Sequence, residues 1–380
     1  MSRIKRLLVV TPGYPSKTNP YYPFVGQLCE EFVRQGMEVT VVCPQSILSE
    51  LKRMRKPRKV HCIDDGNGLV DVFRPYYITI PYRYRSFNNF VFRWCLKRFL
   101  KKSNIRYDAC YCHFWQTGYN TFKCFRDSKI PIFVATGESD ISMLYEFKKD
   151  DSTFSEYLNG VIAVSSKNKE ESIRLGLTTS ENCVVFPNSI DNRLFYQRDK
   201  IEMRAKLGIP NDVFLIAFVG WFIERKGSKR VAEAIHDIKE NNVYSLFIGS
   251  GLEEPLCPNI LFKGQLPHDK IPEYLSAADA FVLPTYNEGC CNAIIEAMAC
   301  GLPIISSNLQ FNWDVLDNTN SLMINPNSVE DIASAIKTLR DNKELRERLS
   351  KGALKRAESL TLQQRAKNIL EFMLYHIEGQ

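Results

Sequence analysis

The chain has 380 residues, and its 44% hydrophobic and 24% charged content is typical of a globular protein. This length exceeds one ordinary hydrophobic core and predicts two domains of roughly 150 to 200 residues. No run of 18 apolar residues occurs, which argues against a membrane-spanning helix. The short apolar run Leu7 to Val10 after the basic start predicts a first strand and not a signal peptide.

The net charge of +7 is unevenly distributed. Residues 1–190 hold 28 Lys and Arg against 18 Asp and Glu, a balance of +10, whereas residues 191–380 hold 22 against 25, a balance of −3. The first half is therefore expected to face something acidic. The twelve cysteines include no Cys-x-x-Cys pair and predict reduced, mostly buried thiols of a cytoplasmic protein.

The first half alternates short apolar runs with amphipathic segments. Helices end where Gly36 and Gly176 supply stop signals. The alternation predicts a parallel sheet covered by helices on both faces. The predicted strands are Arg6–Thr11, Val39–Cys43, Asp108–Cys112, Ile132–Thr136 and Val161–Val164, and the predicted helices are Phe24–Gln35 and Ser166–Leu175.

The second half repeats this pattern. The predicted strands are Phe214–Val219, Ser245–Ile248, Ile260–Lys263 and Ala280–Leu283. The predicted helices are Ser228–Glu240, Ile271–Ala277, Ala293–Cys300, Val329–Arg340, Lys343–Ala357 and Gln363–Ile377. Two tandem α/β domains of the doubly wound, Rossmann-like kind follow from this order.

Domain boundaries are predicted from the segment Asn182 to Phe195, which contains Pro187 and Asn188. Residues 1–188 form the first domain and residues 189–360 the second, and the last helix, about 361–380, is expected to pack back on the first. Ligand sites of such domains lie at the carboxyl ends of the strands, so the cleft between the domains is the default site.

The stretch PTYNEGCCNAIIEAMACGLP, residues 284–303, predicts a ligand directly. Asn292 stands where a helix N-cap belongs, and the free N–H groups of Ala293, Ile294 and Ile295 would bind a phosphate. Two acids, Glu288 and Glu296, are not suited to phosphate and are expected to bind hydroxyl groups. The ligand predicted by this stretch is a phosphate ester with many hydroxyls, such as a nucleotide sugar.

The segment EGCCNAIIEAMACGLPIISS resembles the Glu-x7-Glu donor motif of glycosyltransferase family 4, retaining enzymes of the GT-B fold. Other segments resemble that family in the same order along nearly the whole chain. They are PGYP and PFVGQL near the start, and then HFWQTG. The segments VSS and VVFPNSID follow at the junction between the two domains, and GWFIERKG and SAADAFVLPTYNEG lie in the second domain. The resemblance implies two Rossmann-like domains that face each other across a cleft.

In GWFIERKG, the resemblance implies that Arg225 and Lys226 bind the donor diphosphate. Positive groups there would stabilise the leaving nucleoside diphosphate as its charge grows in the transition state. Family members often have an arginine directly after the glycine, where this chain has Trp221. Because of this difference, Arg225 and Lys226 are expected to be the residues that bind the donor diphosphate.

In the donor motif, the resemblance assigns Glu296 to the ribose hydroxyls and Glu288 to the hydroxyls of the transferred sugar, because a carboxylate can accept hydrogen bonds from a vicinal diol. Asn292 is expected to cap the helix, with donation to the sugar as the alternative. Gly289 is expected to keep the loop tight, although Cys290 and Cys291 replace the aromatic residue and glycine that the family usually has there.

In the first domain, the resemblance places His113 against the transferred sugar, as a positioning and electrostatic residue and not a general base. Asp140 in TGESD resembles an acceptor loop whose histidine is replaced here by Thr136. Gly13 and Gly26 would allow a close backbone approach to the donor phosphate or the acceptor. No Asp-x-Asp motif occurs, and the resemblance implies transfer without a metal or another cofactor.

The stretch Tyr82 to Lys102 holds seven basic residues, no acid, and several aromatic residues. A helix from Phe87 would present a basic amphipathic face suited to an anionic membrane. The segment Lys52 to Lys59 adds six basic residues. Nucleic-acid binding and a merely solvated helix are the alternatives, but no nucleic-acid motif accompanies the charge.

These observations predict a cytoplasmic retaining glycosyltransferase on the inner face of the cell membrane. It would use a UDP- or GDP-type donor and a glycan or lipid-linked acceptor in the biosynthesis of capsule, exopolysaccharide or lipopolysaccharide. One alternative is another GT-B enzyme such as a nucleotide-sugar 2-epimerase, for which five histidines leave little room. The other is a non-catalytic sugar- or nucleotide-binding protein.

Overall fold

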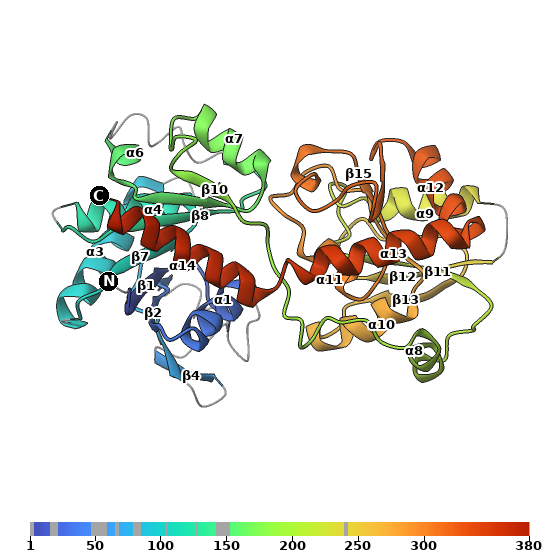
Figure 1. Cartoon of the computed structure of the whole chain (residues 1–380), viewed down its shortest axis with the longest axis horizontal. Helices are drawn as coiled ribbons and strands as arrows, with labels where there is room; N and C mark the ends of the chain where they lie inside the picture. The colour runs from blue at the N-terminus through green and yellow to red at the C-terminus, as the bar shows by residue number, and fades with distance from the viewer. Residues whose placement is uncertain are drawn as a thin grey trace. The chain divides into compact units, whose positions relative to one another are not determined.

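The structure is a computed structural model that describes residues 4–15, 22–46, 59–64, 68–78, 85–103, 105–126, 128–141, 153–238 and 242–379. The chain divides into two compact units, here called unit 1 (Met1–Phe186 with Leu362–Gln380) and unit 2 (Pro187–Thr361). The division after residue 186 lies two residues before the predicted boundary. The last helix belongs to unit 1, as Figure 1 shows in red.

Unit 1 contains an eight-stranded sheet in its described residues, in the order β10-β9-β8-β7-β1-β2-β5-β4. All neighbouring strands are parallel except β4, which runs antiparallel to β5 at the edge. The strands are β1 (Arg6–Val10), β2 (Glu38–Val42), β4 (Lys59–Asp64), β5 (Gly68–Phe73), β7 (Ala109–His113), β8 (Ile132–Thr136), β9 (Gly160–Ala163) and β10 (Cys183–Val185), and β3 (Gln45–Ser46) pairs separately with β6 (Tyr76–Tyr77).

Helices cover both faces of this sheet, because successive side chains of a strand point to opposite faces and those of β1 are buried on both. Leu7 and Val9 of β1 pack in one cluster with residues of α1 and α14, and Leu8 and Val10 pack in the other with residues of α3 and α4. The helices of unit 1 are α1 (Pro23–Arg34), α3 (Arg85–Ser103), α4 (Trp115–Phe125), α6 (Phe154–Tyr157), α7 (Ser166–Arg174) and α14 (Leu362–Glu378).

Unit 2 contains a six-stranded parallel sheet in the order β13-β12-β11-β14-β15-β16. Its strands are β11 (Phe214–Val219), β12 (Val243–Ile248), β13 (Ile260–Gly264), β14 (Ala280–Leu283), β15 (Ile304–Ser307) and β16 (Ser321–Ile324). The helices are α8 (Lys200–Leu207), α9 (Ser228–Asp237), α10 (Ile271–Ala277), α11 (Asn292–Ala299), α12 (Val329–Asp341) and α13 (Lys343–Glu358), with short 3₁₀ turns at η3 (His268–Lys270) and η4 (Gln310–Asn312).

The strand order of each sheet reverses beside its first strand. In unit 1 the reversal falls between β1 and β7, and in unit 2 it falls between β11 and β14. At such a switch point the following loops diverge to opposite faces and leave a crevice at the carboxyl edge of the sheet. Ligands of this fold class bind at that edge, and the sequence places candidate residues of each unit there.

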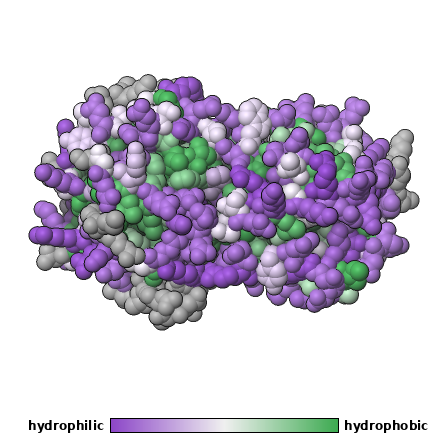
Figure 2. Space-filling view, in the orientation of Figure 1, coloured by the Kyte–Doolittle hydropathy of each residue, from purple (hydrophilic) through white to green (hydrophobic). Residues whose placement is uncertain are grey.

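The predicted strands and helices are confirmed with small shifts. Strand β7 includes His113, one residue beyond the predicted end, and helix α9 ends at Asp237, whereas residues 239–241, which include the predicted end Glu240, lie outside the described ones. In the part of the chain that the structure describes, no helix is long and apolar enough to cross a bilayer. Hydrophilic residues cover most of the face shown in Figure 2.

Candidate functional site

The candidate site of unit 2 lies at the switch point between β11 and β14. These neighbouring strands are parallel, so the loops that follow them leave from the same edge of the sheet. The loop after β11, residues 220–227, carries the predicted basic pair, and the loop after β14, residues 284–291, carries Glu288. The fold thereby joins Arg225 to Glu288 across 63 positions of sequence.

Close backbone packing holds the basic loop against the loop that follows β12. The N–H of Phe222 donates to the carbonyl oxygen of Ser250 at 2.8 Å. A Cβ added to Gly249 would lie 1.9 Å from the carbonyl oxygen of Gly220, so a side chain at Gly249 would force the two loops apart. The path of the basic loop therefore depends on glycine in its neighbour.

Glu288 accepts three donors on one carboxylate oxygen. Its Oε1 lies 2.6 Å from Nη1 of Arg225 and 2.7 Å from Nζ of Lys226. The hydroxyl of Thr285 donates to the same oxygen at 2.8 Å. In this state the two cations predicted to bind the diphosphate are paired with the acid predicted to bind the sugar.

Lys226 keeps its positive charge although its side chain is buried. Burial is the largest influence and lowers the pKa of Lys226, but the charges of an ionised Cys291 and of the hydrogen-bonded Glu288 carboxylate together hold that pKa above its ordinary value. Nζ of Lys226 lies 3.9 Å from Sγ of Cys291. Because burial raises the pKa of the Cys291 thiol, that thiol is neutral at neutral pH and Glu288 is the anion that balances Lys226.

The start of α11 corrects two predictions. Asn292 does not cap the helix, because its side-chain oxygen accepts a hydrogen bond from the amide of Asn188 at 2.8 Å. Cys291 occupies the cap position instead, without a side-chain cap bond. The N–H of Ile294, predicted to be free, donates to the carbonyl oxygen of Cys291 at 3.2 Å, and that of Ile295 approaches the same oxygen at 3.5 Å.

Glu296 lies one turn into α11 and pairs with a histidine that the sequence did not single out. Its Oε1 lies 3.0 Å from Nε2 of His268, in the turn η3 that follows β13. That hydrogen bond, opposed by burial, raises the pKa of His268. The signal was available in the sequence, because a loop after a parallel strand must lie at the same edge as the other candidate residues.

In unit 1, His113 ends β7 at the switch point and is 3% exposed. Its ring contacts the rings of Phe24, Tyr111 and Phe114, with centroids 5.0 to 6.2 Å apart. Burial, and then the charge of Arg365, lowers the pKa of His113 to about 3. Neither ring nitrogen has a hydrogen-bond partner among the described residues, so the ring is a neutral group enclosed by aromatic side chains.

The remaining candidates of unit 1 have mainly local contacts. A Cβ on Gly13 would lie 2.2 Å from the ring of Tyr22, and one on Gly26 would lie 2.6 Å from the ring of Pro15, so both glycines make room for neighbouring side chains. Asp140 is exposed. The sequence analysis did not single out Glu138. Its carboxylate accepts hydrogen bonds from the N–H of Trp115, at the start of α4, and from the hydroxyl of Thr136.

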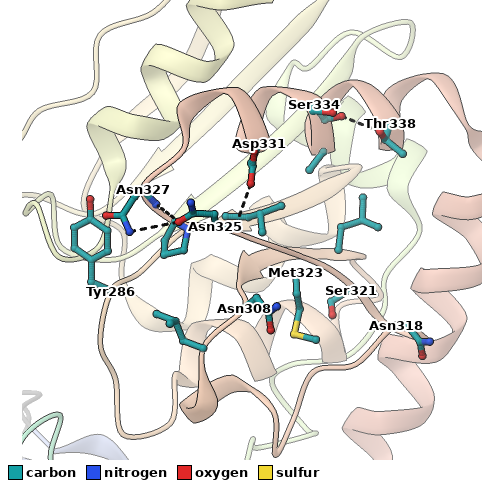
Figure 3. A pocket seen from close by; sticks show the side chains of 15 residues that line it. Tyr286, Asn308, Asn318, Ser321, Met323, Asn325, Asn327, Asp331, Ser334 and Thr338 are labelled. Atoms are coloured by element: carbon teal, nitrogen blue, oxygen red, sulfur yellow. Dashed lines mark hydrogen bonds between the residues drawn. The ribbon is translucent and has the colours of Figure 1, made fainter.

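A second feature of unit 2 is an open cavity of about 1100 Å³ along the edge strand β16 (Figure 3). Polar and apolar side chains line it, and Figure 3 shows Asn325 joined by hydrogen bonds to Asn327 and Asp331. Tyr286 is the lining residue that belongs to the loop of Glu288, and none of the predicted site residues lines the cavity. The cavity therefore meets the loop of Glu288 through Tyr286, whose N–H donates to the carbonyl oxygen of Arg225 at 2.9 Å.

Two family models match the chain. The model described as Glycosyltransferase Family 4 matches residues 24–194, and the model described as Glycosyl transferases group 1 matches residues 199–356. The first covers most of the described core of unit 1, and the second covers the loops that carry Arg225, Lys226, Glu288 and Glu296. Together they span both units.

Individual proteins are similar over much of their length. A putative teichuronic acid biosynthesis glycosyltransferase, TuaC of Bacillus subtilis, is 28% identical over 87% of this chain and 88% of its own. The UDP-Gal:alpha-D-GlcNAc-diphosphoundecaprenol alpha-1,3-galactosyltransferase of Escherichia coli is 27% identical over 66% of this chain and 70% of its own.

Among solved structures, Anabaena Alr3699/HepE in complex with UDP superposes with a TM-score of 0.74 at 15% identity, covering 98% of this chain and all of that one. This similarity confirms the predicted α/β architecture, the GT-B fold with two Rossmann-like domains. That the two domains face each other across a cleft stays a prediction.

Proposed function

Because the chain belongs to the glycosyltransferases of group 1 and Family 4, we propose that it moves a sugar from a UDP- or GDP-type donor to a glycan or lipid-linked glycan during assembly of a surface polysaccharide. The observation that carries the proposal is the pairing of Arg225 and Lys226 with Glu288 at the switch point of unit 2. Glu296 lies on the adjoining helix. The B. subtilis relative, whose name places it in teichuronic acid biosynthesis, supports the polysaccharide part of the proposal.

Donor binding would rearrange the charges of this site. The diphosphate would take the place of the Glu288 carboxylate as the partner of Lys226 and Arg225. Glu288, released from two cations, would accept hydrogen bonds from the hydroxyls of the transferred sugar. Glu296 would accept them from the ribose, since each carboxylate oxygen has two acceptor positions.

The charges then favour departure of the nucleoside diphosphate. Negative charge on the leaving phosphate grows in the transition state, so a buried, permanently charged Lys226 stabilises that state more than the bound donor. We propose that transfer retains the anomeric configuration without a protein nucleophile. His113 suits a positioning role, because its lowered pKa makes it a poor base at neutral pH.

The acceptor is proposed to be lipid-linked, as it is in the name of the E. coli relative. Helix α3 presents Phe87, Phe90 and Trp94, which are 45%, 59% and 55% exposed. They lie along one helix face with Arg98, whose guanidinium lies 5.6 Å from the Trp94 ring. An exposed apolar stripe with basic neighbours fits the surface of an anionic membrane.

The buried side of α3 faces the core of unit 1 through Phe92, Cys95 and Leu96, so the exposed aromatic stripe is not part of that core. Other predicted contributions lie outside the described residues: Arg83, and residues 52–58 of the basic segment Lys52 to Lys59. The side chains of Lys59 and Arg85 lie outside them as well. The protein is proposed to sit peripherally on the inner face of the membrane, brought there by α3.

The test is a transfer assay. Purified protein is incubated with UDP- and GDP-sugars, with and without a diphosphopolyprenol-linked glycan and with and without EDTA. The expected results are slow donor hydrolysis, faster transfer to the lipid-linked acceptor, no effect of EDTA, and a product whose anomeric configuration by NMR matches that of the donor. Failure to release sugar from any donor would refute the proposal.

A further inference from the structure

The loop after β13 brings a histidine to the acid that is proposed to bind the ribose. His268 begins the turn η3, and its Nε2 lies 3.0 Å from Oε1 of Glu296. The Glu296 side chain is 12% exposed and that of His268 is 42% exposed. The pair therefore lies at the boundary between the protein interior and the solvent.

The imidazole is held on its other side by an aromatic ring. The centroid of His268 lies 5.1 Å from that of Phe195, and the planes meet at 58°. Phe195 is buried, and its backbone N–H donates to the carbonyl oxygen of Asp191 at 2.9 Å. His268 is thus fixed by a ring contact to the segment before α8 and by a hydrogen bond to α11.

Resting on the proposed role of Glu296 in donor binding, we propose that His268 is a positioning residue that orients the Glu296 carboxylate toward the two ribose hydroxyls. A carboxylate has about four acceptor positions, and His268 occupies one of them on Oε1. The remaining positions can serve a vicinal diol. A glutamate held in place before the ligand arrives loses less side-chain freedom on binding.

The acidic groups around His268 favour a hydrogen bond from its ring to Glu296. The hydrogen bond to Glu296 is the largest influence on its pKa and raises it, and burial lowers it. Asp269 on the same turn and Asp191 on the adjacent segment also raise it. In either protonation state His268 can donate from Nε2 to Glu296, so the orienting bond does not require the charged form.

The experiment compares nucleotides that differ by one ribose hydroxyl. Dissociation constants of UDP and 2′-deoxy-UDP are measured by titration calorimetry for the wild-type protein, His268→Phe and His268→Gln. GDP and ADP with their 2′-deoxy forms are used if UDP does not bind. Phenylalanine keeps the ring contact to Phe195 and removes the hydrogen bond, whereas glutamine can still donate to Glu296.

His268→Phe is expected to weaken UDP binding about tenfold, the loss of one hydrogen bond to a charged group. It should weaken 2′-deoxy-UDP binding much less, so that the preference for ribose shrinks. His268→Gln should retain most of the affinity and the preference. His236→Phe, at an exposed histidine of α9, is the matched control, and thermal melts monitor folding.

Equal weakening of both nucleotides by His268→Phe would mean a merely structural role and would overturn the inference. Unchanged UDP binding in that variant would overturn it as well. If the wild-type protein bound none of the three nucleoside diphosphates, the proposed donor site itself would fail, and with it this inference. The wild-type measurement therefore separates the two failures.

Discussion

Lys226 is the residue whose replacement should most affect the chemical step. Lys226→Met removes the buried charge that faces Glu288 and is expected to lower turnover by about two to three orders of magnitude, as loss of one electrostatic group at a leaving group does. The measurement is kcat for transfer at saturating donor. Lys206→Met, at an exposed lysine that pairs with Glu273 on the surface of unit 2, is the control. A kcat equal to that of the control would contradict the assignment of Lys226.

His113 should make unit 1 sensitive to acid. Its pKa is about 3 in the folded protein and about 6.5 when unfolded. Between these values the unfolded chain binds a proton that the folded chain does not, so stability falls as the pH falls below 6.5, and above 6.5 this residue contributes nothing. From pH 7 to pH 5 the loss amounts to about 2 kcal/mol.

The variant His113→Leu, close in volume, removes this titration. Its free energy of unfolding relative to the wild type should rise by about 2 kcal/mol between pH 7 and pH 5 in urea melts of unit 1. His236→Leu on the exposed surface of α9 is the control. If the free energies of unfolding of the wild type and of His113→Leu changed in parallel between pH 7 and pH 5, His113 would be protonated in the folded protein at pH 5 and the prediction would be wrong.

Two residues show where reasoning from local sequence stops. Asn292 has the residue type and position of an N-cap, yet Asn188, 104 residues away, engages its side chain. His268 lies 28 residues before Glu296, and nothing local marks the contact. The spacing of Glu288 and Glu296 made both of them candidates from the sequence alone, and their roles in donor binding stay predictions. Their partners depend on which loops the fold brings together.

At the scale of elements, helix α3 carries a prediction of its own. Replacing Arg93, Lys97 and Arg98 by Gln should reduce binding to phosphatidylglycerol vesicles about a hundredfold, since each basic residue near an anionic surface contributes about 1 kcal/mol. The effect should diminish at high salt, because salt screens exposed charges. Sedimentation with vesicles measures it.

The matched control replaces Lys343, Lys351 and Lys355 of α13, which removes the same charge from unit 2. Binding to phosphatidylcholine vesicles should be weak for the wild type, the α3 variant and the α13 variant. A loss that is equal for the α3 and α13 variants would point to overall charge and not to a membrane-binding face of α3.

The strands of both sheets were predictable where an apolar run is buried on both faces, as in β1 and β11, whose residues are almost all buried. The antiparallel pair of β4 and β5 was not predicted, because polar residues interrupt the apolar residues of both strands and β4 lies at the sheet edge. The short strand β10 was missed for lack of length. Whether a segment is a helix or a strand could be predicted from its hydrophobic periodicity. An edge strand forms only beside its neighbouring strand, and the local sequence does not show which strand that is.

At the scale of the whole molecule, α14 returns the end of the chain to unit 1. Ile369 and Met373 are fully buried in one of the two cores of that unit, and the ring of Phe372 lies against Gly160 of β9. Arg365 donates to the carbonyl oxygen of Phe186 at the end of the unit's main segment. The stability of unit 1 therefore depends on residues that follow unit 2 in sequence.

A chain ending at Thr361 should lose about 3 to 6 kcal/mol from the burial of Ile369 and Met373 alone, a large part of the stability of an ordinary domain. Calorimetry is expected to show a lost or strongly lowered transition of unit 1, while nucleotide binding by unit 2 persists. A chain that lacks only Glu378–Gln380 is the control. An unchanged melting profile of the longer truncation would contradict the prediction.

The three donors gathered on Glu288 have a consequence for the ionic behaviour of the molecule. The Glu288 carboxylate already balances one of the two positive charges of Arg225 and Lys226, so donor binding largely exchanges one anion for another. Few dissolved anions are displaced in that exchange, and added salt has little to compete for. Donor affinity should therefore vary with ionic strength much less steeply than membrane association through α3, and the two steps can be separated by salt alone.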